Sequence, residues 1–404
     1  MLSFKSSYLL NILNVHMKKD KLFTRSFLNL TVSNFVMAIA FYFITPIMAL
    51  FMVDTMDAGN DQVGVVMFSF SIAAIIIRPF AGYLLDSHNR YRLYLASFIL
   101  FTSSFLGYPF ASTFMFLLFL RFYHGVTWGA VSTASNTLAV DLIAESRRGE
   151  GIGVFGLSMT IAMAIGPAMA MSMSQKVGYT AIFYTAVLFC VVGFLLALFI
   201  KAPHTRRERK PLSLGALIDK STLPIGANVL MTQIPYGGVI SFAALYGREI
   251  GVMNSSLFFV ILSIGILFSR VVSGRLFDRI GPRVVMITGI LSVSVALLVL
   301  GNFATPAGFF VSAIILGIGF GIIAPTFQAM ANDKVEPLRR GAVNSTYLTF
   351  FDTGVGIGML LFGILFESMG YANTFYFVAG LQLAALLFFV TQSLPNYYKR
   401  VNNN

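Results

Sequence analysis

The segment RPFAGYLLD, Arg78–Asp86, is repeated 192 positions later (270 − 78) as RVVSGRLFD, Arg270–Asp278. Arg, Gly, Leu and Asp recur at the same places in both copies, a match that chance glycines would not produce. The same shift aligns further residues outside the segment: Gly125 with Gly317, Asp141 with Asp333, Gly166 with Gly358, and Tyr179 with Tyr371. The two halves of the chain are therefore predicted to be structural duplicates.

The composition around this repeat is that of a membrane protein. Of the 404 residues, 57% are hydrophobic and 11% are charged, with a mean hydropathy of +0.81, whereas soluble domains carry about 25% charged residues. A membrane-crossing helix needs about 20 apolar residues. Runs of that length predict helices at 26–52, 62–84, 92–111, 114–140, 150–173, 179–200, 222–247, 255–276, 284–302, 307–331, 342–366 and 372–393. The expected fold class is all-α integral membrane, with twelve transmembrane helices in two pseudo-symmetric six-helix bundles.

Polar breaks divide the chain into five parts. We expect an N-terminal tail, a first six-helix bundle, a linker, a second six-helix bundle and a C-terminal tail, at residues 1–25, 26–200, 201–221, 222–394 and 395–404. Residues 1–16 precede a second methionine, Met17, which we interpret as an alternative start of translation. No loop is long enough for a folded domain outside the membrane.

The basic residues set the orientation, because cytoplasmic loops are enriched in Lys and Arg. Of 28 such residues, Arg78, Arg121 and Arg270 fall inside spans and only Lys176 and Arg248 fall on the side opposite the termini. We therefore expect both termini in the cytoplasm and a location in the bacterial cytoplasmic membrane. The net charge of +12 is then explained by topology and anionic lipid, with no nucleic-acid partner.

The scarce reactive residues argue against an enzyme. There is one cysteine, Cys190, and the four histidines show no metal-binding spacing. No nucleotide-binding sequence is present, which leaves an ion gradient as the energy source, and we expect no cofactor and no metal. The acidic residues Asp54, Asp57 and Asp61 are interpreted as topology and solvation.

Four motifs carry a family resemblance over nearly the whole chain. GYLLDSHNRYR (82–92) and GRLFDRIGPR (274–283) resemble the loop signature of the major facilitator superfamily, and the second copy matches it better. LRFYHGVTWGA (120–130) is similar to its fourth-helix motif, and AIGPAMA (164–170) resembles the fifth-helix motif of drug:proton antiporters. The resemblance extends to sugar-efflux-like and metallophore-exporter-like members. Gly166–Pro167 should kink its helix, and the resemblance links that kink to antiport.

The resemblance also implies a conformational latch at the cytoplasmic loops. Asp86 would face the start of the eleventh helix near Arg340, and Asp278 would occupy the equivalent place in the other half. Arg90 or Arg92 would then pair with Asp141, and Arg279 or Arg283 with Asp333. Gly82 and Gly274 would allow close helix approach. The alternative is plain topogenic charge at the loop ends.

Charged residues inside spans are functional candidates, because burying them in lipid is costly. Asp352 is the first candidate for a proton-coupling site, with Arg121 as its electrostatic partner or as a substrate anchor, and His124 as a second titratable group. The alternatives are an interhelical lock for Arg121, a satisfied hydrogen bond for His124 and helix–helix contact for Asp352.

The first, fourth, seventh and tenth helices line the cavity in this superfamily. Their polar or aromatic residues are the expected substrate contacts, or else interhelical contacts: Asn34, Phe41, Tyr42, Trp128, Asn228, Gln233, Tyr236 and Gln328. We expect a monomeric secondary transporter that exchanges protons for an exported small molecule by alternating access. Uptake by proton symport and a transporter-like sensor that moves nothing remain open.

Overall fold

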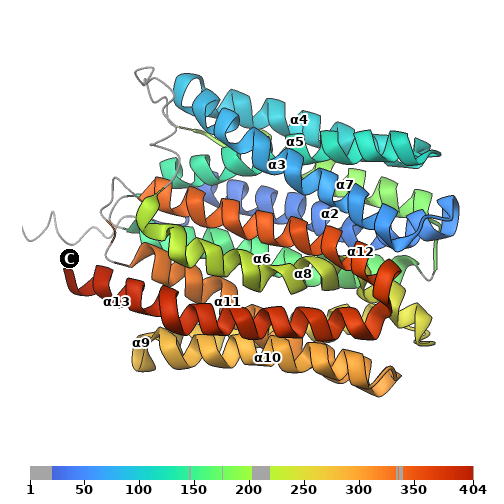
Figure 1. The fold of residues 1–404 in the computed structure, drawn as a ribbon. Coiled ribbons are helices and arrows are strands. Elements are labelled where there is room, and N and C mark those ends of the chain that lie inside the picture. Colours follow the sequence, from blue (N-terminus) through green and yellow to red (C-terminus); the bar gives the residue numbers. More distant parts are fainter. Residues whose placement is uncertain are drawn as a thin grey trace, which may run out of the picture.

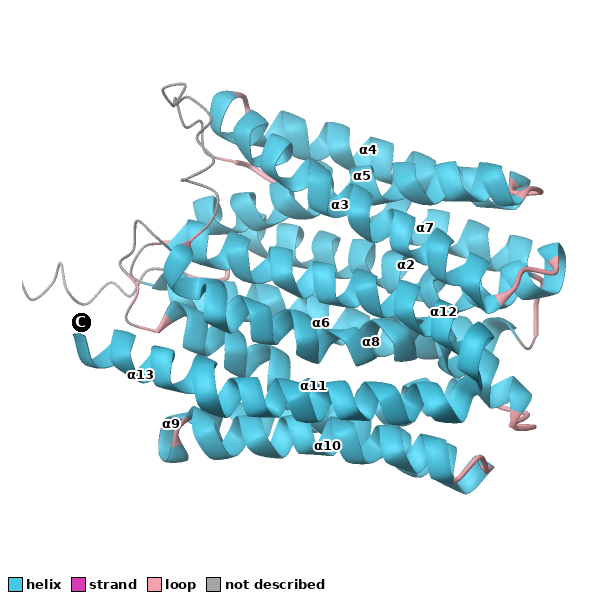
Figure 2. Cartoon of the chain, viewed as in Figure 1, coloured by secondary structure: helices cyan, strands magenta, loops and turns pink. Residues whose placement is uncertain are grey.

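The computed structural model describes residues 21–144, 147–174, 176–202, 219–333, 335 and 340–403. Helices account for nearly all of these residues, and no strand occurs among them (Figure 2). The first half holds α2 (Arg25–Met56), α3 (Asn60–Ser87), α4 (Arg90–Gly107), the short η1 (Tyr108–Phe110), α5 (Phe114–Leu142), α6 (Arg148–Ser174) and α7 (Tyr179–Leu198). The second half holds η4 (Lys220–Thr222), α8 (Leu223–Glu249), α9 (Ser256–Ile280), α10 (Pro282–Asn302), α11 (Pro306–Asn332), α12 (Arg340–Phe388), η5 (Phe389–Ser393) and α13 (Leu394–Asn403).

The described residues form 11 helices that are long and apolar enough to cross a membrane. The last of these holds two crossings, since α12 runs for 49 residues and its backbone breaks at Gly370, where φ is 79°. A positive φ of this kind is readily adopted only by glycine. The expected all-α fold with twelve transmembrane helices is thereby confirmed, and the helices lie side by side in Figure 1.

Short side chains at the helix starts explain several boundaries. Asn89 accepts a hydrogen bond from the Arg92 amide at 3.0 Å, so that α4 begins directly after the turn. Thr113 and Thr305 cap α5 and α11 in the same way, at 3.3 and 3.2 Å. Such caps satisfy amide groups that a helix leaves without partners at its first turn.

The two halves meet through matching helix pairs. Helix α3 packs against α12, and α6 packs against α9, which are equivalent pairs under the internal repeat. A Cβ at Gly64 would lie 3.1 Å from the Leu360 carbonyl oxygen, so a larger residue there would have to push α3 and α12 slightly apart. Within the second half, a Cβ at Gly358 would lie 2.0 Å from the Ile234 carbonyl oxygen. The helices therefore touch backbone to backbone at these points.

The outer surface of the bundle is apolar. Phenylalanines on several helices are at least 70% exposed: Phe110, Phe119, Phe199 and Phe268. Their exposure is expected for side chains that face lipid. Cys190 in α7, in contrast, is fully buried.

Helix α6 continues through Pro167 as one element from Arg148 to Ser174. Gly166 serves close packing, because a Cβ there would lie 2.8 Å from the Cβ of Tyr42 in α2. The C-terminal segment, expected to be a tail, is helical as α13. Tyr397 of α13 donates a hydrogen bond to Asp333 at 2.6 Å, which ties this helix to the end of α11.

Candidate functional site

A cavity of about 250 Å³ lies between the two halves. Seven of the eight expected side chains line it: Asn34, Phe41, Tyr42, Trp128, Gln233, Tyr236 and Gln328. Asn228 does not. Its amide instead donates to the Ala385 carbonyl oxygen at 3.1 Å and to Ser393 at 3.2 Å, so it holds α8 against the last crossing.

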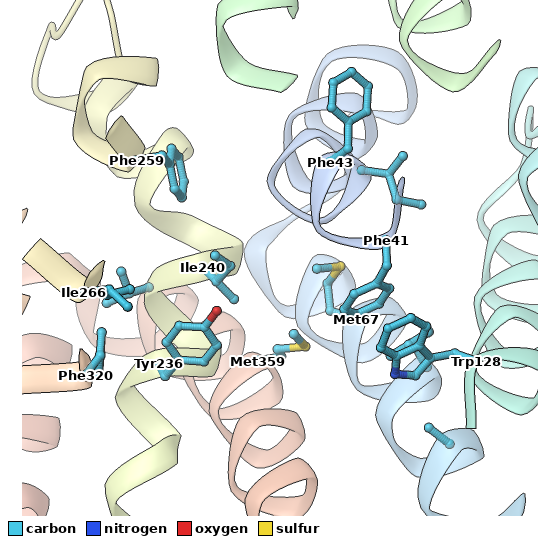
Figure 3. Close-up of a cluster of buried hydrophobic side chains, with 14 of the residues drawn as sticks. Phe41, Phe43, Met67, Trp128, Tyr236, Ile240, Phe259, Ile266, Phe320 and Met359 are labelled. Carbon is cyan, nitrogen blue, oxygen red and sulfur yellow. The ribbon is translucent and has the colours of Figure 1, made fainter. Parts of the chain in front are cut away.

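One wall of the cavity is aromatic. Phe41 of α2 and Trp128 of α5 stack with their ring centres 4.2 Å apart. In Figure 3 this pair is seen on one side and Tyr236 of α8 on the other, with the sulfur of Met359 in the space between them. Flat rings and flexible thioether side chains together suit an apolar molecular body of variable shape.

The cavity also contains charged residues, which form an ion pair between the two halves. Arg78 of α3 contacts Asp352 of α12 at 2.6 Å, and their side chains retain 16% and 24% exposure. Asp352 is the only carboxylate among the described residues that line the cavity. Arg78 lies nine residues before the end of α3, about 13 Å along the axis. Arg78 therefore lies well inside its span, as the apolar run around it predicted.

A second arginine lines the cavity from the other half. Arg270 of α9 donates a hydrogen bond to the Thr160 hydroxyl of α6, again across the interface between the halves. Tyr42, Tyr236 and Tyr347 line the same cavity. Sequence reasoning did not place Arg270, Thr160 or Tyr347 in the site.

Arg121 and His124 lie outside this cavity, and the expected pairing of Arg121 with Asp352 is wrong. Arg121 is 1% exposed, contacts the Met67 sulfur at 3.0 Å, and lies over the Phe70 ring at 5.6 Å. His124 is fully buried and bonds the Tyr108 hydroxyl at 2.7 Å. Aromatic rings that line the cavity separate both residues from it, and these rings prevent the expected contact.

The expected latch residues contact groups within their own halves. The guanidinium group of Arg90 donates to both carboxylate oxygens of Asp141, each at 2.7 Å, and forms an ion pair between α4 and α5 of the first half. Asp333 accepts from Tyr397 of the second half rather than from an arginine in any contact described. The exposed Arg92, Arg279 and Arg283 make no described contact with the other half. The side chains of Asp86, Asp278 and Arg340 lie outside the described residues.

Gly82 and Gly274 also differ from expectation. A Cβ at either position would meet no described atom within 4 Å, so no described residue requires a glycine there. The described contacts between the halves lie instead in the middle of the bundle, at the Arg78–Asp352 and Arg270–Thr160 pairs, and at the end where Asp54 pairs with Arg248. Among the contacts of the described residues, none at these glycines or at Arg90, Arg92, Arg279 and Arg283 joins the two halves.

The end of the bundle that carries Asp54 is where the halves are fastened. Asp54 of α2 forms a bidentate ion pair with Arg248 of α8, in which the Nη2–Oδ2 distance is 3.0 Å. Asp54 also accepts a hydrogen bond from the Tyr179 hydroxyl of α7. Nearby, Glu367 accepts from the amide and the side chain of Asn60, both at 3.3 Å. The sequence interpretation of Asp54 as mere solvation is therefore wrong, since this residue bridges the two halves.

The comparisons with known proteins agree with this architecture. A family model described as Major Facilitator Superfamily matches residues 30–254 and 225–400. The chain belongs to this superfamily, and it is a multi-pass membrane transporter of small molecules rather than an enzyme.

Individual proteins similar to this chain share only a small fraction of its residues. The multidrug resistance protein MdtG of Citrobacter koseri is 26% identical, over 88% of this chain and 92% of its own. The staphylopine export protein of Staphylococcus aureus is 20% identical, over 82% and 87%. The crystal structure of a mutant nucleoside transporter, NupG, superimposes with a TM-score of 0.75 at 14% identity, over 90% of this chain and 98% of the other. Two of these similar proteins are named for drug resistance and for export, and the third is named as a nucleoside transporter.

Proposed function

We propose that this protein exports a small molecule from the bacterial cytoplasm in exchange for protons. The observation that supports this most is Asp352, a carboxylate on the cavity wall that pairs with Arg78 of the other half. A proton on Asp352 removes the attraction between these two residues, which lie on helices that must separate and approach in alternating access. Proton binding at this position is therefore coupled to the relative position of the halves.

The conformation supports the same scheme. The halves are fastened at the Asp54 end, through the Asp54–Arg248 ion pair and the hydrogen bonds from Asn60 to Glu367. With both termini in the cytoplasm, as the distribution of Lys and Arg indicates, this end faces outward. The central cavity is then closed to the outside and ready to take cargo from the cytoplasm. One chain provides the complete cavity, so a monomer suffices.

The direction of transport rests on two relatives named for resistance and export, MdtG and the staphylopine export protein. Uptake by symport is the second candidate, since the same ion pair would serve it. His124 and Arg121 are not proposed as proton carriers, because the rings of Phe41 and Phe70 separate them from the cavity.

The test compares metabolites inside and outside cells that lack, carry or overexpress the gene. Export predicts a compound that accumulates inside the deletion strain and outside the overexpressing strain. Asp352→Asn should abolish that difference, whereas Asp61→Asn, which removes an exposed carboxylate from α3, should preserve it. The reverse accumulation pattern would indicate uptake, and no change with correctly inserted protein would indicate a sensor.

A further inference from the structure

The cavity contains two related polar pairs, only one of which is charge-balanced. The repeat shift of 192 that aligns Arg78 with Arg270 also aligns Thr160 with Asp352 (352 − 192 = 160). The structure makes both cross-half contacts, Arg78 to Asp352 and Arg270 to Thr160. A hydroxyl therefore occupies the position in one pair that a carboxylate occupies in the other.

Arg270 lacks a charged partner at this point in the described part of the chain. The only described hydrogen bond of its guanidinium group is to the Thr160 hydroxyl, and its Nε atom is buried without a hydrogen-bond partner among the described residues. Arg270 lies ten residues before the end of α9, about 15 Å along the axis. A guanidinium group remains protonated at such depth and favours an anion within reach.

A second unpartnered donor lines the same cavity. Tyr236 of α8 is 5% exposed, and its hydroxyl group is buried with no hydrogen-bond partner among the described residues. In Figure 3 Tyr236 lies across the space between the halves from Trp128, with its hydroxyl group on the side of its ring nearest Ile240. A buried hydroxyl without a partner is costly, so an acceptor supplied by a ligand would stabilise it.

The total charge of the cavity points the same way. The charged residues among its described lining are Arg78, Arg270 and Asp352, which sum to one positive charge when Asp352 is ionised and to two when it is protonated. An anion is therefore attracted in both protonation states, whereas a cation is repelled.

We propose that the cargo is an amphipathic organic anion whose carboxylate binds Arg270, where Asp352 binds Arg78 in the related pair. A carboxylate accepts two hydrogen bonds from one guanidinium group, and this geometry favours it over a neutral carbonyl. The apolar body of the cargo packs against Phe41, Trp128 and Met359. This proposal rests on the transport function proposed above and defines the class of substrate that the cavity accepts.

The test is equilibrium binding to the purified full-length protein in lipid nanodiscs. The probes are 1-naphthylacetate, its uncharged methyl ester and 1-naphthylmethylamine, which share a ring system and differ in charge. The wild-type protein should bind the carboxylate at least about tenfold more tightly than the ester, and the amine least. Equal affinity for the carboxylate and the ester, or no binding of the carboxylate, would overturn the proposal.

Two variants of nearly equal size test the position itself. Thr160→Asp supplies the missing carboxylate within the protein, and Thr160→Asn supplies a neutral group of the same shape. The affinity for 1-naphthylacetate should be at least about tenfold lower in Thr160→Asp than in Thr160→Asn, and Arg270→Gln should lose the preference for the carboxylate over the ester. Equal affinities in the two Thr160 variants would refute the assignment.

The binding result can be separated from effects on folding and on transport. A monodisperse elution profile for each variant shows that it is folded, and the preference of Arg270→Gln provides a second reading if Thr160→Asp does not fold. Binding at equilibrium needs neither a proton gradient nor turnover. Failure of the export scheme would therefore leave the anion preference intact, and loss of the preference would leave the export scheme intact.

Discussion

Replacing Asp352 with Asn should destabilise the protein by leaving Arg78 without its counter-charge. Removing one member of a buried ion pair costs about 3–5 kcal/mol. The two side chains retain 16% and 24% exposure, so water offsets part of that loss and we expect about 2–3 kcal/mol. This corresponds to a change of roughly 30- to 150-fold in the ratio of folded to unfolded protein.

The same reasoning predicts a recovery in the double variant. Arg78→Gln/Asp352→Asn contains no unpaired charge at this site, so it should regain about 1–2 kcal/mol relative to Asp352→Asn alone. Unfolding by SDS in mixed micelles can be followed by the fluorescence of Trp128, the only tryptophan in the chain. Its position against Phe41 on the cavity wall makes it sensitive to separation of the helices.

Asp61→Asn is the control, since it removes an exposed carboxylate from the first turn of α3 and should cost less than about 1 kcal/mol. The reasoning about the ion pair would be refuted if Asp352→Asn unfolded at the wild-type SDS concentration. It would equally be refuted if the double variant were no more stable than the single one.

Three further predictions concern other contacts. Arg248→Gln should weaken the fastening at Asp54 by about 1 kcal/mol and raise hydrogen–deuterium exchange about fivefold in the last turn of α8; unchanged exchange there would contradict the bridging role. Gly358→Ala forces a methyl group against backbone and should lower stability by about 1–3 kcal/mol, so an unaltered melting temperature would show that the crossing yields. Arg90→Gln should cost about 3 kcal/mol because Asp141 is only 10% exposed, and adding Asp141→Asn should restore most of it; a double variant as unstable as Arg90→Gln would disprove the pairing.

The helices were predictable because the length of each apolar run directly sets the length of a crossing. The prediction also found Asp352, since an acidic residue in the middle of an apolar run is conspicuous without any knowledge of its neighbours. Seven cavity side chains followed from helices that line the cavity throughout the superfamily. The prediction for Asn228 was wrong because a polar residue on a cavity-lining helix can equally face a neighbouring helix.

Partners across helices were harder to predict, because they depend on how each helix is rotated and on which ends of the two halves meet. Arg121 was assigned to Asp352, yet a layer of aromatic rings lies between the cavity and Arg121. The repeat contained the missing information for the other pair. Its shift relates Asp352 to Thr160 and Arg78 to Arg270, so the Arg78–Asp352 contact, once known, leads directly to the Arg270–Thr160 contact.

The single cysteine has a practical consequence. Because Cys190 is fully enclosed in the bundle, the natural chain should react very slowly with water-soluble maleimides. A thiol introduced at one end of a helix would then be the dominant reactive group in the molecule, without prior removal of any native residue. Labelling such thiols in intact cells and in inverted vesicles would show directly which end of the bundle faces the cytoplasm.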